Sequence, residues 1–436
     1  MRKHTGTLGN LFARRDDGFS LGSLVDVLIA FLLALGPILQ HYRGLLVNAG
    51  ISVLILLLPF VLGRQISKLR EIDYRGILAI IPLAVFVVYK LIDHGFTFEE
   101  FAHGMIVIFY FAVAASGCID TDRFISATTW IASFASILII VQYVCFYIFD
   151  FHLQLVPTGW LLPKSAQWIP RSEIGMVGMD GKPSTFYRPS SFFLEPAHMF
   201  LYLFPPLIIS LSSFSVNRIA KMTAILLSLA LILSTSGMGI ATVVGVWGIY
   251  FLRKAVEMHR LGKRRFFSLK NVVITVSVLL GLTLICFYVP FIRKSINRIF
   301  SAGGTSSNAI SGRISRGLRL TKQLTGTKFW FGVSDNVEGI NFHLSGFNAT
   351  MYRYGLIGVI LSYVFYFRSL LVLKDAYFWI SAVIVVISFF SAHTHGTFYM
   401  QYFVYFLLSG YKFRTPRTRR ICFKKRQKIA NEQGEE

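Results

Sequence analysis

Residues 124–149 read FISATTWIASFASILIIVQYVCFYIF and contain no Asp, Glu, Lys or Arg. A transmembrane helix needs roughly 20 consecutive, predominantly apolar residues, so this stretch is long enough to cross a bilayer. The whole chain has the same character, since 54% of its 436 residues are hydrophobic and its mean hydropathy is +0.59. These values exceed those of ordinary globular proteins. The sequence therefore predicts a polytopic membrane protein rather than a soluble multidomain enzyme.

The apolar runs predict an all-α fold with about 12 transmembrane helices. They lie near residues 22–40, 45–63, 76–93, 104–119, 124–149, 195–213, 221–236, 238–252, 272–292, 351–367, 376–392 and 397–411. We expect one transmembrane domain, residues 22–411, between a cytoplasmic N-terminal segment, 1–21, and a basic cytoplasmic tail, 412–436.

The distribution of the 44 Lys and Arg residues predicts the orientation. Cations of short loops are retained on the cytoplasmic side. Dense basic runs at 253–270 and 412–428 are both cytoplasmic if the N-terminus is inside, which places both termini in the cytoplasm. Topology and attraction to anionic lipid explain most of the net charge of +23. We therefore expect the lipid bilayer, and no nucleic acid, as a partner.

Two long external loops, 150–194 and 293–350, carry cations on the side where they do not help orientation. Loops of this length are uncommon without a function. Their cations therefore indicate an anionic ligand, and the candidate side chains are Arg188, Arg313, Arg316 and Arg319. An alternative for the last three, which recur every three residues, is an amphipathic helix on the membrane surface.

The sequence contains no pattern for a nucleotide, disulfide or metal site. It has no GxxxxGK[ST] or GxGxxG, and its four cysteines form no CxxC pair. Asp120-Thr121-Asp122 lies in a predicted short cytoplasmic turn, so we interpret it as a capped turn. His393 and His395 are two positions apart, which separates side chains on a helix by roughly 200°. We therefore assign His395 to a polar cavity rim and expect neither metal nor cofactor.

The most informative motif is YRPSSFFLEPAH, residues 187–198. Pro196 suits the first turn of a helix, so Glu195 and His198 should share a face at the start of the sixth span. Pro205-Pro206 should interrupt this span, and interrupted helices at membrane depth line cavities. Ionisable residues near a span are functional candidates, although a Glu in this position can also be a simple helix cap.

The segment RPSSFFLEPAH resembles the motif before a mid-chain span in the O-antigen polymerase (Wzy) and O-antigen ligase superfamily of bacterial membrane glycosyltransferases. Five further stretches, in the same order along the chain, resemble elements of that superfamily: LSTSG at 233–237, SGR at 311–313 followed by WFGV at 330–333, GFN at 346–348 and YGLIG at 354–358. The superfamily has His-Asn where this chain has Phe347-Asn348, and His343 is the nearby substitute.

The resemblance implies a polymerase of the bacterial cytoplasmic membrane with its active site facing outward. It would transfer a glycan from undecaprenyl diphosphate to a hydroxyl of another lipid-linked repeat. A flippase and a chain-length regulator of the same pathway would be its partners, and Asn348, His343 and His395 would contact the substrate. The ligase of the same superfamily, which transfers finished polymer to another acceptor, is the first alternative.

The residues themselves suit this reaction. Arg forks match diphosphate oxygens bidentately, so Arg188 and Arg313 can stabilise the leaving group without a metal. Glu195 or His198 would accept the proton of the acceptor hydroxyl, with a slight preference for Glu195. A lipid-linked-oligosaccharide flippase, a transporter, is the alternative from a different class, but the chain shows no two matching halves.

Overall fold

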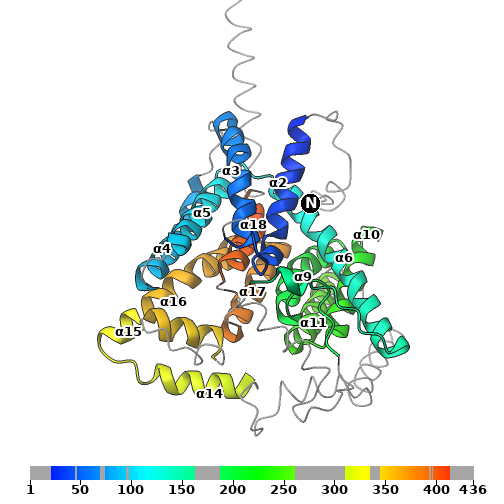
Figure 1. The fold of residues 1–436 in the computed structure, drawn as a ribbon. Coiled ribbons are helices and arrows are strands. Elements are labelled where there is room, and N and C mark those ends of the chain that lie inside the picture. Colours follow the sequence, from blue (N-terminus) through cyan, green and yellow to red (C-terminus); the bar gives the residue numbers. More distant parts are fainter. Residues whose placement is uncertain are drawn as a thin grey trace, which may run out of the picture.

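The computed structural model is all-α and describes residues 21–44, 47–68, 74–94, 98–162, 187–260, 310–333, 344–391, 394 and 396–412. Thirteen α-helices and one short 3₁₀ turn lie in these residues (Figure 1). The helices are α2 (Leu21–Leu39), α3 (Ala49–Lys68), α4 (Tyr74–His94), α5 (Phe98–Ala115), α6 (Thr121–Phe149), α9 (Pro196–Ser212), α10 (Arg218–Leu233), α11 (Gly237–Arg260), α14 (Ile310–Thr321), α15 (Thr327–Phe331), α16 (Gly346–Val372), α17 (Asp375–Phe390) and α18 (Thr397–Lys412); the 3₁₀ turn η2 is Thr158–Trp160.

The helices occupy the positions of the apolar runs. Each run has a matching helix except the run at 272–292, which lies outside the described residues, as do residues 1–20 and 413–436. In the described part, Thr121–Phe149, Gly237–Glu257 and Gly346–Val372 are long and apolar enough to cross a membrane. Several shorter apolar helices accompany them. This architecture fits a multi-pass membrane protein.

The outer surface of the bundle is apolar, as a surface in contact with lipid should be. On α4, exposed large hydrophobic side chains follow one another at intervals of three or four residues, which places them on one face of the helix. They are Leu78, Ile81, Val85, Val88 and Ile92. In water, such a continuous exposed apolar stripe would be costly. Its presence agrees with the membrane location that the composition predicts.

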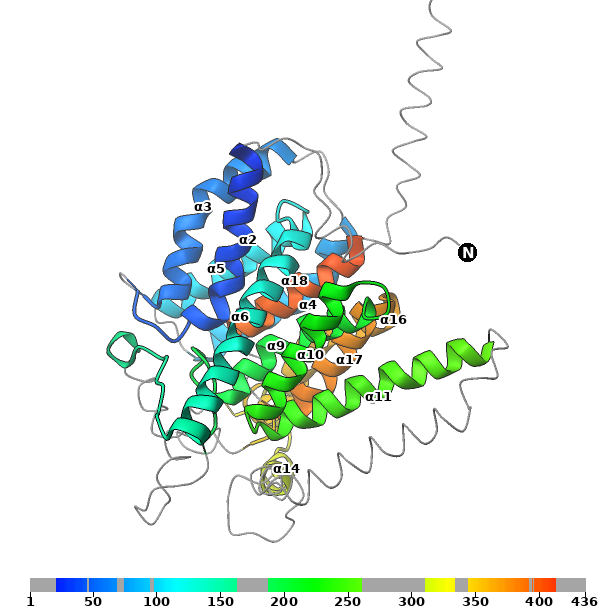
Figure 2. The same ribbon diagram turned by 90° about the vertical axis from the view of Figure 1, so that its right-hand side faces the viewer.

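Helix α9 lies inside the bundle (Figures 1 and 2), and nearly all of its residues are buried. The expected interruption at Pro205-Pro206 is not found, because α9 continues to Ser212. Pro206 cannot donate a backbone hydrogen bond to the Tyr202 carbonyl, but the Tyr402 hydroxyl of α18 donates to that oxygen at 2.6 Å. A neighbouring helix thus replaces the bond that proline removes, and the helix need not break.

Helix α16 has a kink at Gly355, which has φ 61° and ψ −166°. The short helix α15 is seated in this kink. A Cβ atom at Gly355 would clash with the backbone of Trp330 and Phe331, and the Val333 N–H donates to the Tyr352 carbonyl at 2.9 Å. Helix α14 precedes α15 and lies across one end of the bundle, nearly perpendicular to its axis (Figures 1 and 2).

We predict that Gly355→Ala destabilises the protein. A non-glycine residue in this backbone region costs of order 1–3 kcal/mol, and the added methyl would also displace α15. Gly248→Ala in α11 is the matched control, because no described atom beyond the local backbone of its own helix lies within 4 Å of its Cβ position. Thermal unfolding in detergent should show a lower midpoint for Gly355→Ala alone. Equal unfolding midpoints for the two variants would show that the stability of the protein does not require glycine at the α16 kink.

Candidate functional site

The motif at 187–198 forms a short connection that leads into α9. Glu195 is the N-cap residue of α9 and Pro196 occupies the first helical position, as predicted. The Glu195 side chain makes no capping hydrogen bond to the helix, which contradicts the alternative that it is a simple cap. Glu195 and Arg188 are both half-buried. Their functional groups are thus held at one end of a buried helix.

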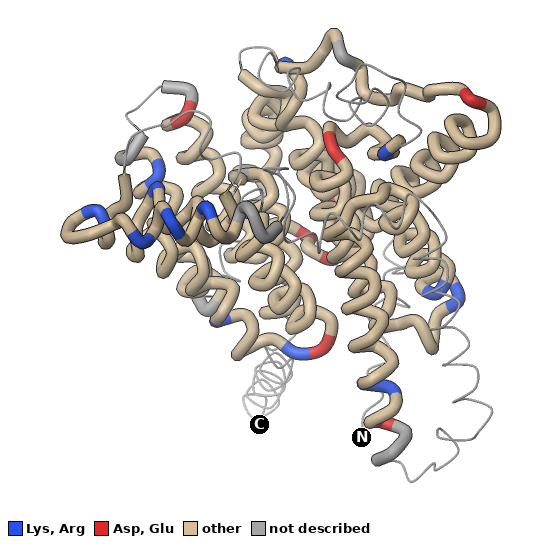
Figure 3. The backbone as a smooth tube through the Cα atoms, turned by 90° about the horizontal axis from the view of Figure 1, so that it is seen from below, with Lys and Arg blue, Asp and Glu red and all other residues tan. Residues whose placement is uncertain are grey.

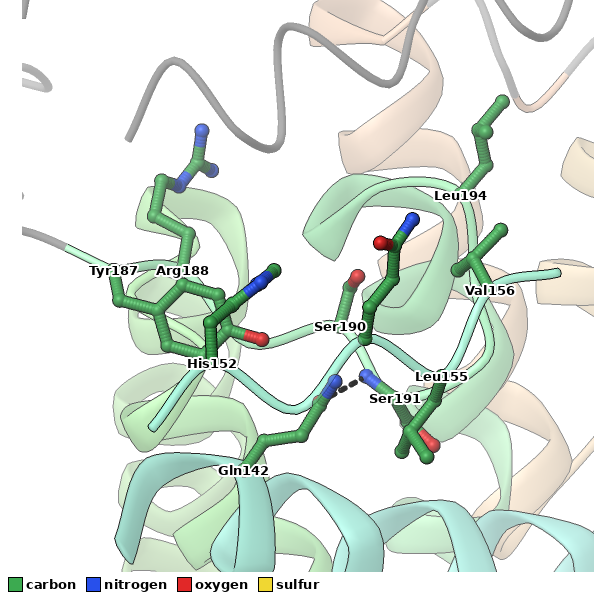
Figure 4. Close-up of a pocket in the computed structure, with 10 residues that line it drawn as sticks. Gln142, His152, Leu155, Val156, Tyr187, Arg188, Ser190, Ser191 and Leu194 are labelled. Atoms are coloured by element: carbon green, nitrogen blue, oxygen red, sulfur yellow. Dashed lines mark hydrogen bonds between the residues drawn. The ribbon is translucent and has the colours of Figure 1, made fainter. Parts of the chain in front are cut away.

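Helix α6 holds this connection in place through Gln142, which is 3% exposed. The Gln142 amide oxygen accepts a hydrogen bond from the Ser191 N–H at 2.7 Å (Figure 4), and its amide nitrogen donates to the Leu153 carbonyl at 3.0 Å. Ser191 has φ 57°, a left-handed conformation that is uncommon for a non-glycine residue. The bond from Gln142 therefore stabilises a strained backbone between Arg188 and Glu195.

A second clamp comes from the segment that follows α2. The Tyr42 hydroxyl donates to the Phe192 carbonyl at 3.2 Å, and burial raises its pKa to about 12, so it stays a donor at neutral pH. The Arg43 N–H donates to the Trp160 carbonyl at 2.7 Å, and its Nε donates to the Leu161 carbonyl at 2.9 Å. Three segments distant in sequence, 41–43, 151–162 and 187–195, are thus joined at one end of the bundle.

Next to these segments lies a small open pocket with an empty volume of about 400 Å³ (Figure 4). Many of its lining side chains can form hydrogen bonds, and they come from the end of α6, from the segment 152–156 and from the motif. The lining consists of Gln142, His152, Gln154, Leu155, Val156, Tyr187, Arg188, Ser190, Ser191 and Leu194. Amide, hydroxyl, imidazole and guanidinium groups in one pocket suit a polar, hydroxyl-rich or anionic ligand.

The second candidate base, His198, lies deeper than Glu195 and is 5% exposed. Its ring is stacked on His41, with centroids 4.7 Å apart, and faces Tyr399 of α18 at 5.9 Å. The Tyr399 hydroxyl donates to the His198 carbonyl at 2.9 Å, and Glu195 is close enough to Tyr399 to interact with it electrostatically. His198 therefore belongs to a buried aromatic stack, whereas Glu195 lies nearer the surface.

The other predicted ligands lie on different elements. Arg313, Arg316 and Arg319 are on α14, where a row of cations is visible from below (Figure 3), and the side chains of Arg316 and Arg319 are exposed. Asn348 is buried in the first turn of α16, where it donates to Ser345 Oγ at 2.8 Å and lies beneath Gly317 of α14. It packs α14 onto α16 rather than facing an open pocket.

The remaining predictions have mixed outcomes. His343, His395 and the Arg313 side chain lie outside the described residues. Phe347, at the position of the histidine in the related motif, stacks on Phe389 with centroids 5.3 Å apart, so its role is in packing. Asp120 caps α6 by accepting hydrogen bonds from the Asp122 and Arg123 N–H groups, which confirms the interpretation of the DxD as a capped turn.

Three residues near the site were not predicted: His41, Gln142 and Tyr399. His41 comes directly after the first apolar run, and Gln142 is a polar residue inside the fifth, so both carried a local signal as polar residues at or within a span. The partners that place them at the site, Ser191 for Gln142 and His198 for His41, are more than 40 residues away along the chain. No periodicity within one helix could have identified those contacts.

No protein-family model matches the chain, and no curated protein matches it. The function must therefore be argued from the residues and their geometry.

We predict that Gln142→Leu loosens the connection before α9. The change keeps the side chain close in volume but leaves the buried Ser191 N–H without its acceptor, at a cost of about 1–3 kcal/mol. The control is Gln154→Leu, an exposed amide of the same pocket, which should change stability by less than about 0.5 kcal/mol. Thermal unfolding and amide hydrogen exchange of residues 187–195 report the difference. Identical protection in both variants would exclude the clamp.

Proposed function

We propose that the protein is a membrane glycosyltransferase that polymerises lipid-linked oligosaccharide repeats. It would lie in the bacterial cytoplasmic membrane with about 12 spans, both termini in the cytoplasm and the site at the outer face. The donor would be a glycan on undecaprenyl diphosphate, and the acceptor would be a hydroxyl of another lipid-linked repeat. The lipid bilayer, a flippase and a chain-length regulator of the same pathway would be its partners.

The observation that best supports this proposal is the arrangement at the start of α9. A guanidinium, Arg188, and a carboxylate, Glu195, are held on one clamped connection, beside a pocket with several hydrogen-bonding side chains. Glycosyl transfer from a diphosphate needs a cation for the leaving group, a base for the acceptor hydroxyl and polar groups for the sugars. This part of the chain contains all three.

In the proposed reaction, the acceptor oxygen attacks the anomeric carbon of the donor sugar. The bond between that carbon and the diphosphate oxygen breaks, and undecaprenyl diphosphate leaves with the electron pair. Arg188 stabilises the charge on the leaving diphosphate through its two-pronged guanidinium, and the α14 arginines, Arg313 above all, bind further anionic groups. Glu195 accepts the proton of the acceptor hydroxyl.

The geometry favours Glu195 over His198 as the base. A base must come within hydrogen-bond reach of the acceptor hydroxyl. Glu195 is half-buried at the end of α9, whereas His198 is stacked between His41 and Tyr399. We therefore assign His198 to positioning: its ring and its carbonyl fix the first turn of α9 against α18.

Two other functions use the same groups. A ligase of the same superfamily would transfer finished polymer to a lipid or protein acceptor, and it would need the same cation and base. A flippase would need cations for the diphosphate but no base. A half-buried carboxylate, Glu195, on the same connection as Arg188 therefore supports a transferase over a transporter, since transport requires no proton acceptor at this site.

The proposed topology predicts that the turn between α14 and α15 and the turn between α9 and α10 face opposite sides of the membrane. In a variant without native cysteines, a membrane-impermeant maleimide should label Gln323→Cys, between α14 and α15, in intact spheroplasts. Val216→Cys, an exposed residue between α9 and α10, should react only after lysis. Labelling of both sites before lysis would refute the proposed topology, and labelling of Val216→Cys alone before lysis would refute the outer placement of the site.

Deletion of the gene should leave single repeats where the parent strain makes polymer. Intact polymer that is not attached would indicate a ligase, and intermediates retained at the cytoplasmic face would indicate a flippase. Complementation with Glu195→Gln should reduce polymer at least 100-fold at normal protein level, because general-base catalysis contributes roughly 10²–10⁴-fold. Glu257→Gln, at the far end of α11, is the control and should restore normal polymer.

A positioning role for His198 predicts a graded effect. His198→Phe keeps a flat ring in the stack and should therefore make more polymer than His198→Ala. Both His198 variants should make more polymer than Glu195→Gln. Normal polymer from Glu195→Gln together with loss in His198→Phe would transfer the role of base to His198.

A further inference from the structure

Helix α15 presents three consecutive aromatic side chains on the surface. Phe329, Trp330 and Phe331 are 38%, 51% and 53% exposed, and the neighbouring Lys328 is also exposed. These rings do not form part of a protein core, although the backbone that carries them is firmly attached to α16 and α4. Exposed aromatic clusters on a rigid backbone mark interaction surfaces.

The attachment of α15 defines its height along the bundle. The Tyr89 hydroxyl of α4 donates to the Phe331 carbonyl at 2.7 Å and also contacts the Tyr354 carbonyl at 3.3 Å, beside the α16 kink. Tyr89 lies five residues before the end of α4 at His94. The aromatic cluster is therefore level with the last turns of an apolar helix, where a bilayer meets water.

The cluster also continues an apolar surface. The exposed stripe of α4 ends at Val88 and Ile92, next to Tyr89, the residue that binds α15. Helix α16, which packs on α4, has its own exposed apolar stripe. It consists of Ile360, Val364, Phe367 and Leu371. The two helices pack on each other, and α15 is bound at the end of the α4 stripe.

We propose that α15 is a membrane-interface anchor, in which Phe329, Trp330 and Phe331 insert among the outer-leaflet phospholipids while Lys328 lies beside their phosphates. Aromatic side chains are enriched at the level where apolar tails meet polar headgroups, and a flanking cation is attracted to phosphate. The anchor would hold α14 and its arginines at the membrane surface. It requires a membrane-embedded bundle but not the glycosyl transfer proposed above.

A bilayer explains these features better than another protein does. Tyr89, which binds α15, lies next to the exposed apolar stripe of α4, the face of that helix that lipid tails would cover. The cluster also combines rings with a cation, a combination that matches a phospholipid with its apolar tails and anionic phosphate. A second copy of the chain would need a complementary surface and would bury the cluster only in a concentration-dependent way.

The experiment uses the full-length chain without native cysteines, reconstituted in vesicles of phosphatidylcholine and phosphatidylglycerol. Trp330→Cys and Phe331→Cys carry an environment-sensitive fluorophore. Gln323→Cys, on the exposed turn between α14 and α15, carries the same label and is the matched control. Nitroxide-labelled phospholipid tests contact with lipid, and iodide tests contact with water. Thermal unfolding verifies that each variant is folded, and Phe329→Cys replaces any variant that is not.

We expect nitroxide lipid to quench the labels at 330 and 331 at least roughly twofold more strongly than the label at 323, and iodide to do the reverse. Equal access of iodide to all three labels would overturn the proposal, because α15 would then lie in water. If the labels at 330 and 331 are instead shielded from both quenchers, and this shielding is lost when the protein is diluted with lipid, the proposal is overturned. A second copy of the chain would then cover α15. Neither result depends on the polymerase activity.

Discussion

Hydrogen bonds from tyrosine hydroxyls to backbone carbonyls hold the centre of this fold together. The Tyr402 hydroxyl of α18 donates to the Tyr202 carbonyl of α9, and the Tyr202 hydroxyl donates in turn to the Ala34 carbonyl of α2 at 2.9 Å. The two tyrosine rings are stacked, with centroids 4.9 Å apart. In an apolar surrounding, an unsatisfied carbonyl costs several kcal/mol, so these bonds connect three helices and allow Pro205-Pro206 to remain inside one of them.

The position of the candidate site follows from this arrangement. Since hydrogen bonds with α2 and α18 fix His198 and Tyr202, the first two turns of α9 have a defined place, and Glu195 is placed with them. The connection before α9 has no regular secondary structure of its own, and it is held instead by Gln142 and Tyr42. A rigid helix with a clamped connection at its end restricts the positions of the Arg188 and Glu195 backbone, as the proposed reaction would require.

The sequence predicted the features that depend on neighbouring residues. The apolar runs marked the helices, Pro196 marked the start of α9, and Asp120 was identified as a cap. The features that depend on distant residues were missed or predicted wrongly. Pro205-Pro206 was expected to interrupt the helix because the compensating hydroxyl comes from Tyr402, on another helix. The stack of His41 on His198 and the bond from Gln142 to Ser191 likewise form only when the bundle assembles.

The structure also distinguishes two groups of cations that the sequence pattern did not distinguish. Arg316 and Arg319 are exposed on α14, where water solvates their charge, so their presence alone is weak support for a bound anion. Arg188 is half-buried in a strained, clamped connection, and a charge in such a place is costly unless anionic or hydrogen-bonding groups compensate it. A phosphate bound in the pocket would meet at Arg188 a guanidinium that is less exposed to water than those of Arg316 and Arg319, so the attraction between the charges would be less screened. The charge argument for an anionic substrate therefore applies most strongly to Arg188, which adjoins the same pocket as Ser190 and Ser191.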